Sequence, residues 1–126
     1  MAHIGPLLRA EATDEAGAGP VYALQTSALH QNPIGLVHGG VLTSLLDQAI
    51  AIVAWTAADR RPTVTVQMDT RFLAAARAGD FLEVRPRIRH ATRSLLFVDA
   101  DLTVGATTVA TASAIMKITA TAGATT

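Results

Sequence analysis

The sequence predicts an α+β fold in which one long antiparallel sheet packs around one long apolar helix. The helix is predicted over residues 41–58, which are rich in Leu, Ala and Ile and contain no Gly or Pro. After the helix, most of the chain consists of runs rich in Val, Thr, Leu or Ile, joined by short connections with turn residues. Short connections are typical of antiparallel neighbours in a sheet.

The predicted helix is about 18 residues, or roughly 27 Å, long. Residues 30–40 precede it and are dense in Gly, Asn and Pro, which indicates an irregular loop. Because the helix is apolar on nearly every face, we expect it to be buried all round, with the sheet as its wrapper.

Five strands are predicted, over residues 21–29, 63–73, 81–90, 95–104 and 107–118. Pro86 interrupts the third of them, and since proline cannot donate to a ladder, it predicts a bulge or an edge at that point. An open sheet also leaves unpaired edge strands. Pairing the edges of two subunits would cover them, so we expect a homodimer at least.

The composition predicts one domain spanning residues 1–126, with a core over about residues 20–118 and an Ala/Thr/Gly tail, 119–126, that frays. Half of the residues are hydrophobic but only 4% are aromatic, so the core must consist of small aliphatic side chains. Ten basic and ten acidic side chains give a net charge of zero. This balance argues against a protein that binds nucleic acid through a basic field.

The chain contains no cysteine, which excludes disulfides, thiolate metal sites and a cysteine nucleophile. We expect no metal and no separate cofactor. The first ten residues lack a charged segment followed by an apolar one, and no uncharged apolar run approaches the ~18 residues of a membrane span. A cytoplasmic protein without membrane attachment is therefore expected.

Asp47 is the one ionisable side chain between Gly39 and Ala58, about two turns inside the predicted helix. Removing a carboxylate from water is costly without partners, so a lone acid in an apolar helix indicates a functional site. Two alternatives remain. Asp47 could point to solvent on a polar stripe, or it could be satisfied by a buried hydrogen-bond network; the stripe would consist of Thr43, Ser44 and Gln48.

The segment before the helix carries a resemblance to a known family. Asn32, Gly35, the run His38-Gly39-Gly40 and Asp47, at this spacing, resemble the phenylacetate-degradation (PaaI-like) branch of the hotdog thioesterases, in the 4-hydroxybenzoyl-CoA thioesterase superfamily. The resemblance continues through residues 64–68, 71–73, 78–80 and 109–117 and covers about residues 20–118. It departs at Ala75, where the family usually has Pro.

This resemblance implies a hotdog fold and an enzyme that hydrolyses an acyl-CoA to a free acid and CoA. Asp47 would be the catalytic carboxylate, either as general base or as nucleophile. The amide of Gly39, at the helix N-terminus, would donate to the thioester carbonyl and stabilise the oxyanion. The alternative for Gly39 is a simple turn that leads into the helix.

The resemblance also implies roles for other residues of the motif. Thr65 would hold the attacking water, or it packs in a strand; Asn32 would orient the catalytic groups, or it shapes the turn before Pro33. His38 either assists catalysis or braces the loop, and Gly40 is expected to contact the substrate.

For the coenzyme, the resemblance favours the turn of Arg93 and Ser94. Arg85, Arg87 and Arg89 alternate along one predicted strand and could meet phosphates, although a solvated strand face is the simpler interpretation.

Eight residues separate Gly39 from Asp47, or roughly 12 Å along one helix. One thioester carbonyl cannot contact both, because each group must come within about 3 Å of it, directly or through one water. The site must therefore combine Gly39 of one subunit with Asp47 of another. The family is consistent with a dimer of such dimers.

Two other functions compete with hydrolysis. A hotdog hydratase or dehydratase would act on enoyl or 3-hydroxyacyl thioesters and would need a catalytic His, for which only His38 is near. A non-catalytic acyl-CoA-binding module would gain nothing from a buried acid. The acyl group itself stays open among aryl-acetyl, benzoyl and medium-chain groups.

Overall fold

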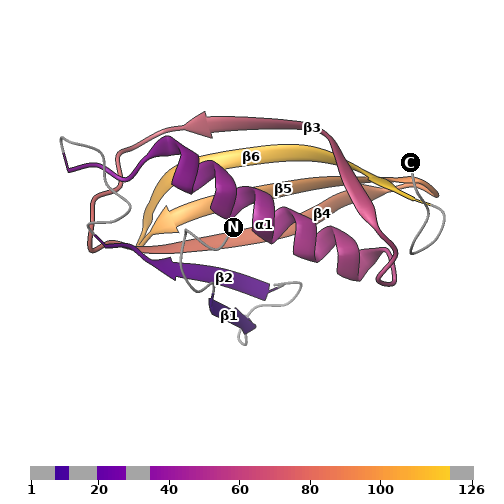
Figure 1. The fold of residues 1–126 in the computed structure, drawn as a ribbon, viewed down its shortest axis with the longest axis horizontal. Coiled ribbons are helices and arrows are strands. Elements are labelled where there is room, and N and C mark those ends of the chain that lie inside the picture. The colour runs from indigo at the N-terminus through magenta and orange to yellow at the C-terminus, as the bar shows by residue number, and fades with distance from the viewer. Residues whose placement is uncertain (1–7, 12–19, 28–34, 120–126) are drawn as a thin grey trace.

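The computed structural model describes residues 8–11, 20–27 and 35–119, which form one sheet and one helix. Along the chain the elements are β1 (Leu8–Glu11), β2 (Pro20–Gln25), α1 (Gly39–Ala57), β3 (Thr63–Phe72), β4 (Phe81–Ala91), β5 (Leu95–Val104) and β6 (Thr107–Ile118). The strand order is β1-β2-β4-β5-β6-β3, and all neighbours are antiparallel. Figure 1 shows α1 across one face of this sheet, with β3 along one long edge and β1 and β2 along the other. The predicted α+β architecture is confirmed.

Most predicted bounds agree with the structure. β5 and β6 begin and end where predicted, and α1, β3 and β4 differ from their predicted ranges by one or two residues. The prediction for β2 was too long, because the strand ends at Gln25. β1 was not predicted. Asn32 and the tail beyond Thr119 lie outside the described residues.

The core lies between α1 and the sheet. The buried positions of the helix recur every three or four residues and face the sheet, as an amphipathic helix requires: Leu42, Leu45, Leu46, Ala49, Ile50 and Ala54. They pack on inward-facing residues of the strands, among them Leu82, Val84, Leu96, Val98, Leu102 and Met116. A core of small aliphatic side chains is therefore what the structure contains.

The helix is not buried all round, so that expectation was wrong for a single chain. The sheet covers one side of α1, and the opposite side carries exposed residues such as Trp55, which is 45% exposed. By length and composition alone α1 could cross a membrane, but its sheet-facing stripe packs like the core helix of a globular domain. The sheet packs on one side of α1 and does not close around it. The helix therefore has more apolar surface than one chain covers.

Pro86 lies where β4 has only one described neighbour. β2 pairs with β4 over residues 81–84, whereas Pro86 pairs with Ala100 of β5 and has no described partner on its other side. The predicted edge is confirmed. The bulge falls later, between Ile88 and His90.

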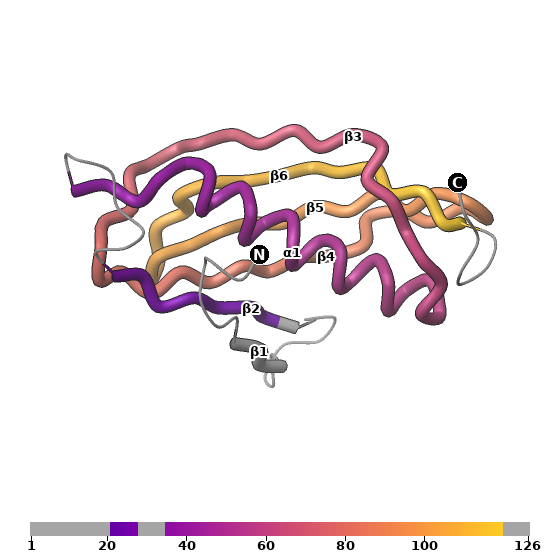
Figure 2. Tube along the Cα trace, viewed as in Figure 1, coloured from indigo at the N-terminus to yellow at the C-terminus, as the bar shows by residue number. Residues whose placement is uncertain are grey.

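The two ends of α1 lie at opposite ends of the molecule (Figure 2). The helix begins beside Phe72, at the end of β3. It ends near the β4–β5 turn, where the carbonyl of Pro62 accepts from the amide of Thr119 at 2.9 Å and the carbonyl of Ser94 accepts from that of Ile118 at 2.8 Å. The start of β3 and the β4–β5 turn are thus joined at this second end.

Candidate active site

The first turn of α1 begins with backbone amides that have no acceptor among the described residues. The carbonyl of His38 accepts from the amides of Val41 and Leu42, at 3.0 and 3.3 Å, and the His38 side chain makes no capping hydrogen bond. No described residue accepts from the amides of Gly39 or Gly40. Amides at a helix start carry partial positive charge, so this end of α1 is suited to a developing oxyanion.

The fold of one chain does not itself require glycine at either position. A Cβ on Gly39 would lie 3.6 Å from Cζ of Phe72, which is ordinary van der Waals contact. A Cβ on Gly40 would meet nothing within 4 Å. Neither residue has the positive φ that favours glycine. The missing side chains therefore leave room for a group that approaches from outside the chain.

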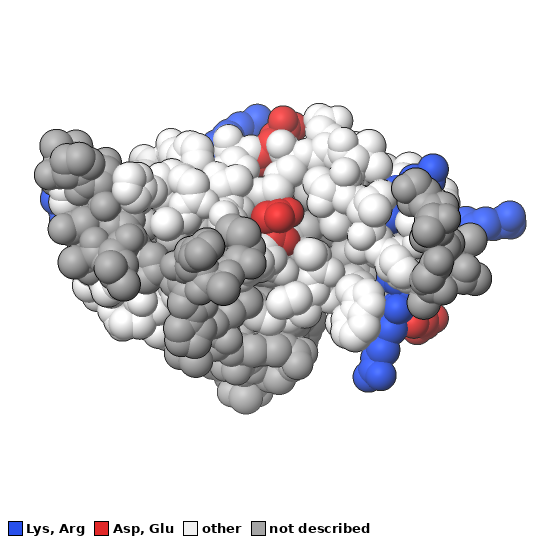
Figure 3. Space-filling view, viewed as in Figure 1, with Lys and Arg blue, Asp and Glu red and all other residues white. Residues whose placement is uncertain are grey.

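Asp47 is exposed on the side of α1 that faces away from the sheet. The expectation that it is buried was wrong for a single chain, because Asp47 lies opposite the buried stripe. Thr43, Ser44 and Gln48 are half-buried beside it, so the outward orientation given as the alternative is the one observed. Figure 3 shows one acidic group over the middle of α1, with uncharged side chains on the described surface around it.

Gly39 and Asp47 belong to one unbroken helix. They are therefore separated by roughly 12 Å along its axis, which is too far for both to contact one carbonyl group. The chain by itself does not bring together the two groups for which the sequence predicts the central roles.

Thr65 lies on β3 with its side chain on the helix-facing side of the sheet. Its Cα pairs with that of buried Met116, and its hydroxyl donates to the Met116 sulfur at 3.4 Å. Between Thr65 and Gln67 the register shifts, so Val66 is an extra residue in the edge strand. The hydroxyl keeps its acceptor capacity, because a contact to sulfur uses only its proton.

Arg93 and Ser94 are exposed in the β4–β5 turn, at the other end of the molecule from Gly39. Arg60 and Arg61, which follow α1, are exposed as well. In Figure 3, basic side chains gather at the end where α1 finishes. The predicted oxyanion donor, the Gly39 amide, and the predicted coenzyme turn thus lie at opposite ends of the molecule. Arg60 and Arg61 lie at the same end as that turn, which the sequence did not indicate.

The alternating arginines of β4 form a solvated, ion-paired face. Arg87 donates to Asp101 at 3.0 Å, and longer pairs, each at 3.7 Å, join Arg85 to Glu83 and Arg89 to Asp99. All three arginines are exposed. The simpler interpretation of this stripe is therefore the one that the structure supports.

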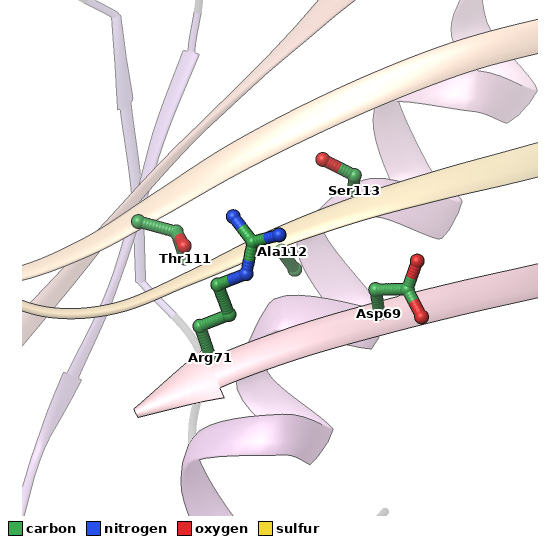
Figure 4. A pocket seen from close by; sticks show the side chains of 5 residues that line it. All are labelled: Asp69, Arg71, Thr111, Ala112 and Ser113. Atoms are coloured by element: carbon green, nitrogen blue, oxygen red, sulfur yellow. The ribbon is translucent and has the colours of Figure 1, made fainter. Parts of the chain in front are cut away.

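A shallow pocket lies on the same outer face of the sheet, between β3 and β6 (Figure 4). Arg71 points across Ala112 toward β6, and the pocket is also lined by Asp69, Thr111 and Ser113. Its volume is about 60 Å³. Drug-sized ligands occupy pockets of about 300 Å³ or more, so an acyl group and its coenzyme need a different surface.

A larger groove of about 350 Å³ lies at the end of α1, lined by Ala51, Ile52, Trp55, Pro62 and Thr63. Sequence reasoning missed it. The available signal was the position of Ala51 and Trp55, four and eight residues after Asp47, which places all three on one helix face.

Residues 34–120 match the family model described as the thioesterase superfamily. This chain belongs to the thioesterase superfamily. The match includes the helix start, Asp47, β3 and the β4–β5 turn. As a thioesterase with one helix packed on an antiparallel sheet, the chain has the hotdog fold and is a thioester hydrolase.

Individual relatives agree with this assignment. "Putative esterase PA0474" of Pseudomonas aeruginosa is 34% identical over 99 residues, covering 78% of this chain and 74% of the relative. Human acyl-coenzyme A thioesterase 13 is 32% identical over 79 residues, 62% of this thioesterase and 56% of the human protein. The structure of a phenylacetic acid degradation-related protein from Ralstonia eutropha JMP134 superposes with a TM-score of 0.77 at 29% identity, covering 89% and 84% of the two chains.

Proposed function

We propose that this thioesterase hydrolyses acyl-CoA in a site shared between two subunits, with Asp47 of one and the Gly39 amide of the other. The observation that carries the proposal is that α1 presents two groups suited to thioester cleavage, which lie too far apart to act together in one chain. An exposed carboxylate lies on its outward face, and uncapped amides lie at its start. Each supplies one half of a thioester-cleaving site, and neither reaches the other within one chain.

A second subunit joins these halves if the chains pair along β3. β3 is an edge strand of the sheet, at the opposite edge from β1 and β2. Three of its large apolar side chains, Val64, Val66 and Phe72, are 45%, 58% and 53% exposed. Large apolar side chains on an open edge strand are typical of a strand that pairs with another chain. Such pairing would also cover the outward face of α1, where Asp47 lies.

The reaction follows from these groups. With Asp47 as general base, the carboxylate takes a proton from water, whose oxygen attacks the thioester carbon. The Gly39 amide donates to the oxygen that becomes negative. The C–S bond then breaks, its electron pair leaves with the sulfur, and the proton held by Asp47 passes to that sulfur.

With Asp47 as nucleophile, a carboxylate oxygen attacks the carbon instead and forms an anhydride, which water then opens. A single turnover in water labelled with heavy oxygen separates the two mechanisms. Label found in the Asp47 side chain indicates the anhydride, and label found only in the released acid indicates the general base.

Other residues support these roles. Thr65, on the helix-facing side of β3, would orient the water, with Asn32 placed to orient the catalytic groups. Gly40 supplies a second amide beside the substrate, one with no acceptor in the described part of the chain, and His38 begins the helix through its carbonyl. In the β4–β5 turn, the Arg93 guanidinium and Ser94 would contact the coenzyme phosphates.

The name of the human relative, an acyl-coenzyme A thioesterase, supports a CoA thioester as the substrate. The exposed arginines at the end of α1 fit the phosphates of such a coenzyme. We propose hydrolysis without a metal or a separate cofactor, in the cytoplasm, by a dimer or a dimer of dimers.

The primary test is hydrolysis over a panel of acyl-CoAs by wild type and Asp47→Asn. We expect kcat to fall by about two orders of magnitude or more, as for loss of a catalytic acid–base group. Asp59→Asn is the matched control, because Asp59 is also exposed, follows the same helix and has a positive φ that Asn tolerates. A loss below about tenfold in Asp47→Asn on every active substrate would remove Asp47 from the mechanism.

The Gly39 amide can be deleted with little change to the helix. Proline is well suited to the first helical position, and His38, with ψ of 137°, already has the extended conformation that precedes proline. Gly39→Pro should lose about a hundredfold or more in kcat, while Gly39→Ala, which keeps the amide, should stay within about tenfold of wild type.

Mixing the two inactive variants tests the shared site directly. Equal amounts of Asp47→Asn and Gly39→Pro chains, refolded together, should recover about a quarter of wild-type activity, because about half of random dimers are mixed and each holds one complete site. If the mixture stays as inactive as its components while mixed dimers are shown to form, each site lies within one chain.

A further inference from the structure

The groove beside Trp55 is an apolar surface on the same helix as Asp47. Three of its lining residues come from α1: Ala51, Ile52 and Trp55. The other two are Pro62, just before β3, and Thr63, the first residue of β3. The polar side-chain groups of this lining are the Thr63 hydroxyl and the indole N–H of Trp55, and the other lining side chains are aliphatic. A lining of this kind suits an apolar group better than a phosphate.

The groove continues the helix face that carries Asp47. Ala51 and Trp55 follow Asp47 at four and eight residues, so they lie about 6 and 12 Å further along the same side of α1. An extended chain advances about 3.5 Å for every three bonds. A straight acyl chain that starts at a carbonyl beside Asp47 therefore passes Ala51 after about five bonds and reaches Trp55 after about ten.

The indole at the end of this path is held in place. The guanidinium of Arg60 lies over the Trp55 ring, 5.8 Å from its centroid, and the amide of Arg60 donates to the Trp55 carbonyl at 2.8 Å. Arg60 reaches this position through a turn in which it and Asp59 have φ of 63° and 54°. Left-handed backbone is unfavourable for residues other than glycine, so the turn that braces Trp55 is maintained at a cost of stability.

We infer that this groove binds the acyl chain of the substrate and that Trp55 sets its length, with straight chains of about eight to ten carbons preferred. This inference rests on the proposed function, since it measures the chain from a carbonyl held at Asp47. An aryl-acetyl or benzoyl group is too short to span the path from Asp47 to Trp55. The groove volume of about 350 Å³ lies at the low end of the range for ligand sites, which fits a chain of medium length.

Kinetics with saturated acyl-CoAs of increasing length test the inference. For wild type we expect kcat/KM to rise about fourfold with each added methylene until about ten carbons, and then to level. Ala51→Phe should block the path halfway and move the optimum to about five carbons, with short-chain activity within about twofold of wild type. Trp55→Ala should weaken selection among chains of eight or more carbons, whereas Trp55→Phe should keep it.

Phe81→Ala is the matched control, because Phe81 is apolar and 41% exposed but begins β4, at the other end of the molecule. Its chain-length profile should equal that of wild type. If acyl-CoAs are hydrolysed but Ala51→Phe and Trp55→Ala both keep the wild-type profile, the groove does not hold the chain and the proposed function stands. If no acyl-CoA is hydrolysed, the proposed function itself is wrong.

Fluorescence gives a direct readout, since Trp55 is the only tryptophan of the chain and is about half exposed. In Asp47→Asn, which holds substrate without turning it over, decanoyl-CoA should shift the emission to the blue and CoA alone should not. A shift with CoA alone would assign the groove to the coenzyme. Emission that follows the protein concentration and ignores decanoyl-CoA would assign it to a second copy of the chain, and either result overturns the inference.

Discussion

β3 and β5 are both ten-residue strands that pair with β6, one on each side, yet their environments differ. In β5 every second residue is buried: Leu96, Val98, Ala100 and Leu102. In β3 no residue is fully buried, although it carries Val64, Val66 and Phe72. The difference comes from position, because α1 packs mainly on β4 and β5 whereas β3 forms the edge.

One chain therefore leaves a large apolar surface uncovered. Large hydrophobic side chains are exposed at six places in the described part of the chain, and five of them belong to α1, β3 or the residue after β3: Trp55, Val64, Val66, Phe72 and Leu73. A surface of this kind marks an interaction site. Trp55 belongs to α1, as Asp47 does, and β3 packs against the same helix, so much of this surface lies on the elements that carry the candidate site.

The largest effect on stability is expected from a charge placed on the buried side of β5. Val98 on β5 is 1% exposed, and Val98→Asp would bury a carboxylate without a partner. We expect a loss of more than about 4 kcal/mol of stability, enough to unfold most domains of this size. Circular dichroism and urea denaturation measure it. A folded Val98→Asp protein with near-wild-type stability would mean that the core is not where the structure places it.

The same substitution of valine by aspartate on the edge strand β3 should separate the subunits and leave the chain folded. Val66 on β3 is 58% exposed in one chain, so Val66→Asp buries a charge only if a second chain covers the edge. We expect the far-UV spectrum to be retained, the mass in sedimentation to fall to that of one chain, 13.1 kDa, and activity to fall about a hundredfold or more.

Val66→Thr is the control for this edge, because threonine keeps the branched shape without a charge. It should retain both the oligomer and the activity. A Val66→Asp protein that remains oligomeric and active would show that β3 does not form the interface. A monomeric protein with full activity would show that the site is not shared.

The fold was largely predictable from the sequence because its signals are local. The apolar run of α1 and the turn residues between β4, β5 and β6 fix those elements within a residue or two. β1 was missed because four residues carry too little pattern to indicate a strand. The burial of α1 was misjudged because composition shows how apolar a helix is but not how much of it one sheet can cover.

The candidate site residues come from the sequence, and the structure adds where they lie in one chain. Glycines at a helix start and a lone acid within the helix are visible in sequence, and the length of the helix already separates Gly39 from Asp47. The exposure of Asp47 was not visible, since it depends on which side of α1 faces the sheet. The Trp55 groove was missed because Pro62 and Thr63 meet α1 only after the chain has turned back.

The smallest effects concern the arginines, which the sequence left as two alternatives for coenzyme binding. Arg93→Ala should raise KM for acyl-CoA about tenfold and leave kcat nearly unchanged. A tenfold change corresponds to the lower end of the free energy that a charge-assisted hydrogen bond contributes. Arg87→Ala should leave KM unaltered and cost under about 1 kcal/mol of stability, because its pair with Asp101 is solvated on both sides. A tenfold rise in KM for Arg87→Ala but not for Arg93→Ala would move the coenzyme from the end of α1 to the outer face of the sheet.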